Sequence, residues 1–198
     1  MRNTLFKVFL LLLMADSARV QGKEKSSQKQ PWSEYTVNQI DRPHPVKVQS
    51  PGVVCAKPPK GALVLFDGTN TDAFTVGWKI KDSLMIASPR STRTKKSFGS
   101  CTLHLEWRVP AGRKIDGQKG GNSGVFLMDR YEIQIMESHT NVTYADGQAA
   151  AIYGQTPPSV NASLPQGEWQ SYDITLRRRF MARMASKNLP ISLSCIMA

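Results

Sequence analysis

Cysteine and histidine are both scarce in this chain, which holds three of each among its 198 residues. The cysteines at 55, 101 and 195 stand far apart, and none of the paired spacings used by zinc sites occurs. We therefore predict no metal site. In an exported protein Cys55 and Cys101 can form a disulfide, which would link the segment before the domain to a core strand. Whether their Cβ atoms come close enough depends on the fold.

No apolar run approaches the roughly 20 residues that a membrane-spanning helix requires, so we expect no transmembrane segment. At the start of the chain, Arg2 and Lys7 accompany a short apolar run over 8–15, and small residues follow at 20–22. This order predicts a signal peptide over residues 1–22 and a secreted or periplasmic protein. The alternative is a buried N-terminal helix.

Acidic residues are outnumbered by basic ones, 15 to 26, which gives a net charge of +11. Much of the excess lies in residues 23–60 and in a cluster of Arg90, Arg93, Lys95 and Lys96. Neither region carries a helix-turn-helix pattern, a zinc spacing or aromatic residues interleaved with basic ones. We predict a solvated basic surface, with no nucleic-acid partner. Residues 23–60 are interpreted as a linker that ends in an extended segment before the domain.

A sustained helical repeat of apolar residues is also absent before Thr175. Residues 61–180 instead contain short apolar segments separated by Gly, Pro and Asn turns. The clearest two-residue alternation occurs in 102–108, 131–137 and 169–176. The pattern predicts an all-β domain over 61–180, an antiparallel sandwich or jelly roll.

Alternation in two of these segments separates polar from apolar side chains. The polar ones are His104, Glu106, Arg108, Glu132 and Gln134. Neighbouring strands bring side chains within about 5 Å of each other. We therefore predict that these five groups gather on the open face of a single sandwich.

A series of short motifs makes the domain recognisable. In chain order they are Leu65-Phe66-Asp67-Gly68-Thr69, Leu105-Glu106-Trp107-Arg108, Gly120-Gly121-Asn122-Ser123-Gly124, Tyr131-Glu132-Ile133-Gln134-Ile135, Ile152-Tyr153-Gly154 and Gly167-Glu168-Trp169. In order and spacing the series resembles the 3-keto-disaccharide hydrolase domain from about residue 61 to 180. The resemblance implies a secreted jelly roll of the concanavalin A or laminin G type that acts on a carbohydrate, a glycoside oxidised at C3. Three residues depart from the family pattern, namely Trp107, Glu137 and Gln170.

The implied substrate defines the groups that a site needs. A 3-keto group acidifies the proton on C2, so a base can remove that proton and the enolate can expel the C1 substituent. We assign Arg108 to the developing oxyanion, and either Glu132 or His104 to proton abstraction. The substrate-binding candidates are Glu106, Asn122, Gln134 and Tyr153.

Each assignment has a structural alternative. Glu106 and Arg108 form a cross-strand ion pair on a solvated face, and His104 is a half-exposed strand residue. Tyr153 and Trp169 pack in the core or at its rim instead of stacking on a sugar.

The glycine-rich stretch 120–124 is interpreted as a tight turn, in which Asn122 bonds local backbone. Neither a helix start nor a lysine follows it, as a phosphate-binding loop requires, and we predict no cofactor. The competing functions are a non-catalytic carbohydrate-binding module and a structural envelope module, because a fold does not fix a function.

The sequence pattern changes after Phe180, since residues 181–198 lack strand alternation and turn chemistry. Met-Ala pairs stand at 181–182, 184–185 and 197–198. Each is written ATG-GCN, which holds the glycine codon GGC in another frame, after Asp, Asn, His or Tyr. One permitted continuation after Phe180 reads DGEDGEQKPANITVLHNG, a strand followed by an Asn-Gly turn. We infer that the domain is truncated by a shifted frame, and that the lost strands leave an unstable or inactive chain.

Resequencing the gene tests this inference. We expect one nucleotide to be missing directly after the Phe180 codon. An intact run of ATG-GCN codons would instead establish a genuine short variant tail.

Overall fold

The computed structural model describes residues 29–52, 57–119 and 121–177, together with the backbones of strands at 5–6, 9–11 and 193–196. In these parts the architecture is all-β, with one 3-10 turn, η1 (Ala145–Gly147), as the helical element. The predicted all-β class is confirmed. Across the same residues, no helix has the length and apolarity that crossing a membrane requires.

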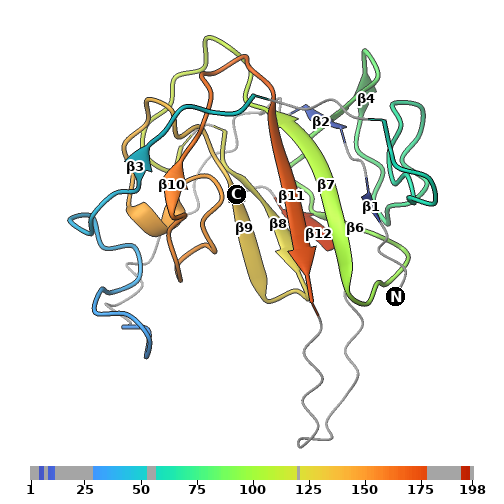
Figure 1. The fold of residues 1–198 in the computed structure, drawn as a ribbon. Helices are drawn as coiled ribbons and strands as arrows, with labels where there is room; N and C mark the ends of the chain where they lie inside the picture. Colours follow the sequence, from blue (N-terminus) through green and yellow to red (C-terminus); the bar gives the residue numbers. More distant parts are fainter. Residues whose placement is uncertain are drawn as a thin grey trace, which may run out of the picture.

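The largest sheet is built around the longest strand, β7. Its members are β1 (Leu5–Phe6), β2 (Phe9–Leu11), β4 (Ile80–Lys81), β5 (Leu84–Ile86), β7 (Cys101–Arg108) and β11 (Gln170–Leu176). β7 and β11 run antiparallel, with Asp173 opposite His104 and Ser171 opposite Glu106 (Figure 1). β1 and β2 pair with β7 in parallel.

Two further sheets complete the described fold. One has the order β6-β12-β8-β9, from β6 (Thr92–Arg93), β12 (Leu193–Ile196), β8 (Ser123–Leu127) and β9 (Tyr131–Ile135). The other is a parallel pair of β3 (Val46–Lys47) and β10 (Val160–Asn161).

Three strands lie in segments where the sequence predicted no strand. β1 and β2 lie within the predicted signal peptide, and β12 lies in the segment expected to lack strands. Their pairing tests neither cleavage nor the reading frame, so both stay predictions. Cys55 lies outside the described residues, and its pairing with the buried Cys101 stays a prediction as well.

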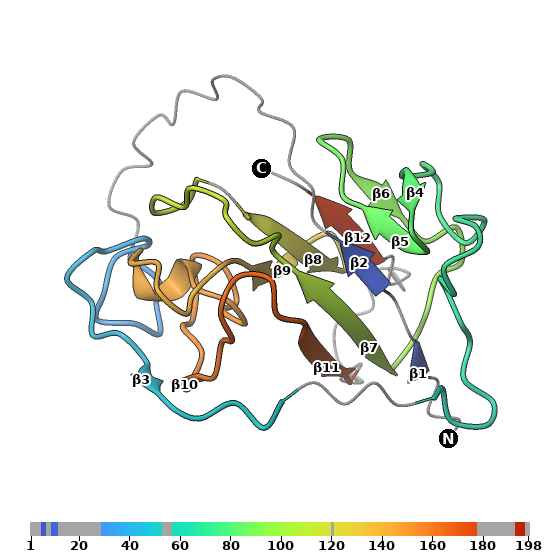
Figure 2. The ribbon, with the colours of Figure 1, turned by 90° about the horizontal axis from the view of Figure 1, so that it is seen from above.

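The two larger sheets share one apolar core. Leu103, Leu105 and Trp107 of β7 belong to the same buried cluster as Val125 of β8 and Ile135 of β9. Figure 2, seen from above, shows β7 and β11 on one side and β8 and β9 on the other. The two-residue alternation thus places the apolar sides as predicted.

The long loop after β9 is hydrogen-bonded to both pairs of strands. The Tyr172 hydroxyl of β11 donates to the Gln134 carbonyl of β9 at 2.7 Å and accepts from the Ala150 backbone N–H at 2.8 Å. One side chain therefore connects both sheets and the loop.

Removing that hydroxyl is a test of how the layers are joined. We expect Tyr172→Phe to lower the free energy of unfolding by about 0.5–1.5 kcal/mol, because the Gln134 carbonyl loses the donating hydroxyl and keeps only the Ala150 N–H, 3.0 Å away. Tyr131→Phe, which alters a ring that packs against the core, is the control and should cost less. Urea unfolding of both variants measures the difference, and equal costs would contradict the assigned role.

Candidate active site

Three amide side chains form a network beside β9. Gln134 Nε2 donates to Gln118 Oε1 at 3.2 Å, and Asn122 Nδ2 donates to the same oxygen at 3.1 Å. Gln118 Nε2 in turn donates to Thr143 Oγ1 at 2.8 Å and to the Gly147 carbonyl at 3.1 Å. Gln134 is 0% exposed, yet its Oε1 has no hydrogen-bond partner among the described residues. A buried acceptor without a partner is unusual, so the amide network lacks one donor at this position.

Glu132 lies on the same side of β9 as Gln134. It reaches across β8 over Gly124, where an added Cβ would lie 2.6 Å from the Glu132 Cγ. The glycine therefore makes room for the carboxyl group. Burial raises the pKa of Glu132 to about 7, which suits a general base that works near neutral pH.

Two tyrosines lie close to this carboxyl group. The hydroxyl groups of Tyr144 and Tyr153 are 2.6 Å apart, and their rings meet edge to face with centroids 6.2 Å apart. The pKa of Tyr144 is raised by burial first, then by Tyr153, and further by the charges of Asp146 and Glu132. Tyr144 is thus a neutral phenol that can donate a hydrogen bond. We call Gln118, Asn122, Glu132, Gln134, Tyr144 and Tyr153 the β9 cluster.

A second polar group lies on β7. His104 is buried between two carboxylates, with its Nδ1 2.8 Å from Asp173 Oδ1 and its Nε2 3.3 Å from Glu106 Oε1. Arg108 lays its guanidinium over the Trp169 ring, 4.8 Å from the centroid. The alternative of a half-exposed His104 is therefore wrong.

The prediction that the polar side chains of these strands gather on one face is wrong. β7 pairs with β11, and β9 pairs with β8. Because the apolar sides of both pairs meet in one core, the intervening polar side chains turn away from it in opposite directions. His104, Glu106 and Arg108 lie on one side, and Glu132 and Gln134 lie on the other. Packed sheets are about 10 Å apart, so Arg108 cannot reach a carbonyl beside Glu132.

The structure also gives the positions of the remaining residues that the sequence singled out. Asn122 and Tyr153 join the β9 cluster, whereas Gln118 and Tyr144 were missed because they stand in loops without alternation. Glu137 is turned inward, where its carboxylate accepts from the backbone N–H groups of the next residues, at 2.9 Å for His139 and 3.0 Å each for Thr140 and Asn141. It anchors a turn and does not contribute to the β9 cluster. Across the described ranges, no group of three or more His, Cys, Asp and Glu side chains is placed to hold a metal ion.

The chain belongs to the 3-keto-alpha-glucoside-1,2-lyase-like domain family, which matches residues 61–181. It is also similar to the crystal structure of a Parabacteroides distasonis protein described as a candidate glycosyl hydrolase. The identity is 25% and the TM-score 0.59, covering 80% of this chain and 92% of that one. No curated protein matches the chain.

The raised pKa of Glu132 has a consequence for stability. From its ordinary value of 4.5 the pKa rises to about 7 in the folded chain, so the folded chain holds this proton more tightly than the unfolded chain. The stabilising effect is complete below pH 4.5 and is lost as the pH rises through 7.

Glu132→Gln should therefore melt at a higher temperature than the parent at pH 8 but at the same temperature at pH 4. Solvent screening limits the gain to about 3 °C. Scanning calorimetry at both pH values checks the difference, with the exposed Glu34→Gln as a control that should change neither. A gain at pH 4 equal to that at pH 8 would rule out the desolvated carboxyl as the cause.

Proposed function

We propose that the β9 cluster cleaves the glycosidic bond of 3-keto-glycosides by removing the C2 proton and eliminating the C1 substituent. The observation that carries the proposal is the position of Glu132. Its carboxyl group is half-buried over Gly124 and close enough to Tyr144 to raise the pKa of that phenol. It stands on a strand of the motif most specific to the family. The family's description and that of the structural neighbour support a sugar substrate.

Each part of the cluster has a role in this elimination. The Glu132 carboxylate takes the C2 proton, and the electron pair of the broken C–H bond moves into an enolate on the C3 oxygen. The enolate then collapses, the C1–O bond breaks, and a C1–C2 double bond remains. Gln134 Oε1, which lacks a partner, accepts a hydrogen bond from a sugar hydroxyl.

The oxyanion role passes from Arg108 to neutral donors. Only one of the two hydroxyl protons in the Tyr144–Tyr153 pair is needed for the bond between them, so the other can be donated to the enolate oxygen or to the leaving group. Donors already fixed in place stabilise developing charge at low reorganisation cost. Water added across the double bond completes a net hydrolysis.

The proposal also covers the architecture of the domain and the location of the protein. We propose that the two sheets are joined as an antiparallel jelly roll of the concanavalin or laminin G type. Together with the leader-like segment at residues 1–22, this supports a carbohydrate-acting protein that works outside the cytoplasm.

Paired variants test the base. On 4-nitrophenyl 3-keto-glucoside, Glu132→Gln should lower kcat by about 10²- to 10⁴-fold with little change in KM. His104→Gln, on the opposite side of the core, should keep kcat within about twofold of the parent when corrected for the folded fraction. Release of nitrophenol is followed in the chain as encoded and in a version with the frame restored after Phe180. Loss of turnover in His104→Gln alone would transfer the base to β7.

The placement of Arg108 favours a second candidate function, a non-catalytic carbohydrate-binding module. In such a module the β9 cluster binds a sugar but does not stabilise an oxyanion, because Arg108 lies over Trp169 on the other side of the core. Calorimetric binding of the 3-keto-glucoside without product, in both versions of the chain, would establish the module.

A further inference from the structure

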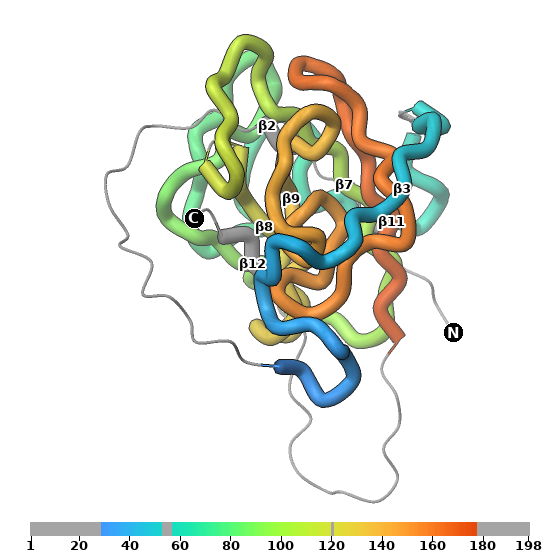
Figure 3. Tube along the Cα trace, turned by 90° about the vertical axis from the view of Figure 1, so that its left-hand side faces the viewer, coloured from blue at the N-terminus to red at the C-terminus, as the bar shows by residue number. Residues whose placement is uncertain are grey.

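A segment outside the family-matched domain lies across the candidate site. Residues 29–50, which we call the strap, run over the loop that follows β9 (Figure 3). They are held there along their length: Gln30 Nε2 donates to the Gly154 carbonyl at 3.4 Å, His44 Nδ1 is 2.6 Å from Gln148 Nε2, and the Val48 N–H donates to the Asn161 carbonyl at 3.0 Å. The predicted linker therefore packs on the domain in a defined position.

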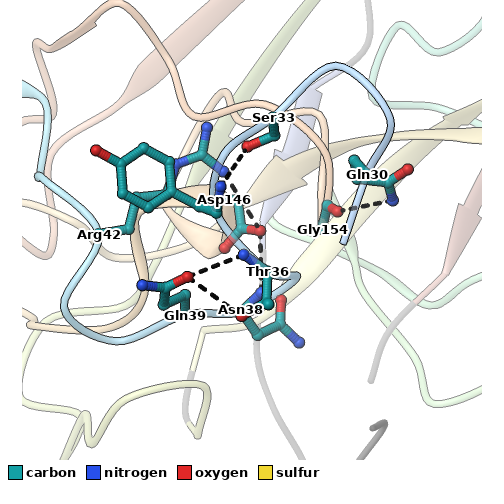
Figure 4. A network of polar contacts seen from close by, with 9 residues as sticks. Gln30, Ser33, Thr36, Asn38, Gln39, Arg42, Asp146 and Gly154 are labelled. Atoms are coloured by element: carbon teal, nitrogen blue, oxygen red, sulfur yellow. Dashed lines mark hydrogen bonds and ion pairs between the residues drawn. The ribbon is translucent and has the colours of Figure 1, made fainter. Parts of the chain in front are cut away.

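The strap also contacts a buried carboxylate. Asp146 in η1 is 0% exposed, and its Oδ2 accepts from the Asn38 backbone N–H at 3.1 Å (Figure 4). Arg42 Nη1 lies 3.9 Å from the same oxygen, with an Arg42 side chain only 12% exposed. Because an unpaired buried charge is costly, the position of Asp146 depends on these two strap residues.

Local geometry in the strap directs both groups at Asp146. Asn38 adopts a left-handed backbone conformation with a φ of 60°, which asparagine tolerates better than most residues. The turn that presents it is closed by Gln39 Oε1, which accepts from the Thr36 N–H at 2.9 Å. The Arg42 guanidinium also lies 5.0 Å from the centre of the Tyr35 ring, which fixes its orientation.

The turn that carries Asp146 also carries part of the β9 cluster. Tyr144 comes two residues earlier, and Gly147 offers its carbonyl to Gln118 and Gln134, at 3.1 Å and 3.4 Å. The Gly154 N–H donates back to the Asp146 carbonyl at 2.9 Å, so the same turn also holds the end of the loop next to Tyr153. Movement of Asp146 would shift two tyrosines and the acceptor shared by two amides.

We propose that Asn38 and Arg42 are positioning residues of the β9 cluster, so that the functional unit begins at the strap rather than at residue 61. The inference rests on the proposed function only in taking the β9 cluster as the sugar site. The strap fixes Asp146, and Asp146 fixes the turn that aligns Tyr144, Tyr153 and Gln134.

The test compares two arginine–aspartate pairs in the full chain. Arg42→Ala removes the buried pair, whereas Arg93→Ala removes the pair with Asp129, which has a 3.2 Å contact and exposed side chains. Hydrogen exchange of backbone amides over 144–154 should become faster in Arg42→Ala and stay unchanged in Arg93→Ala. On the 3-keto-glucoside, kcat should fall about tenfold in Arg42→Ala with a smaller change in KM, because the Tyr144–Tyr153 pair that donates to the developing charge is no longer aligned.

Two further variants keep the test decisive. Arg42→Lys retains a cation and should restore protection in part, and Asp146→Asn retains an acceptor for the Asn38 N–H while removing the charge. Unchanged exchange over 144–154 in Arg42→Ala, or faster exchange spread equally over β7 and β11, would overturn the proposal. Because exchange needs no turnover, inactivity of both the encoded chain and the version with the frame restored would refute the elimination reaction and leave the strap to be judged by exchange alone.

Discussion

The packing of Leu105 and Trp107 against Val125 and Ile135 determines where the polar side chains of both sheets point. Each strand alternates, so burying one side of β7 and one side of β9 in the same core leaves their other sides facing apart. The polar residues of β7 and those of β9 are separated for that reason. Any substrate that binds beside Glu132 meets groups from loops, and meets none from β7.

This constraint explains which features the sequence predicted and which it did not. Alternation correctly placed His104 and Glu106 on one side of their strand, and Glu132 and Gln134 on one side of theirs. Alternation carries no information on which strands pair, because pairing depends on how the whole chain folds back. It therefore did not show that β7 pairs with β11 while β9 pairs with β8. Gln118 and Tyr144 stand in irregular segments where no periodicity assigns a direction, and only the folded structure brings them to Glu132.

The docking of the strap on the domain could not be predicted from the sequence either. Residues 23–60 are polar and lack apolar periodicity, and such a composition is typical of a linker. Yet Arg42 and Asn38 dock onto a single buried carboxylate more than one hundred positions away in sequence. A contact of that kind depends on one charge and one backbone conformation, neither of which alters composition enough to be recognised.

The buried carboxylates of this fold differ in whether they have hydrogen-bonding or charged partners. Glu106 faces His104, Glu137 accepts from consecutive backbone N–H groups, and Asp146 meets the strap. Glu132 differs, because burial is what raises its pKa, to about 7. A protein gains no stability by desolvating a carboxyl group at neutral pH. Such a cost is expected where the group must take up a proton, and this difference is why we propose the site at β9 rather than at His104 and its two carboxylates on β7 and β11.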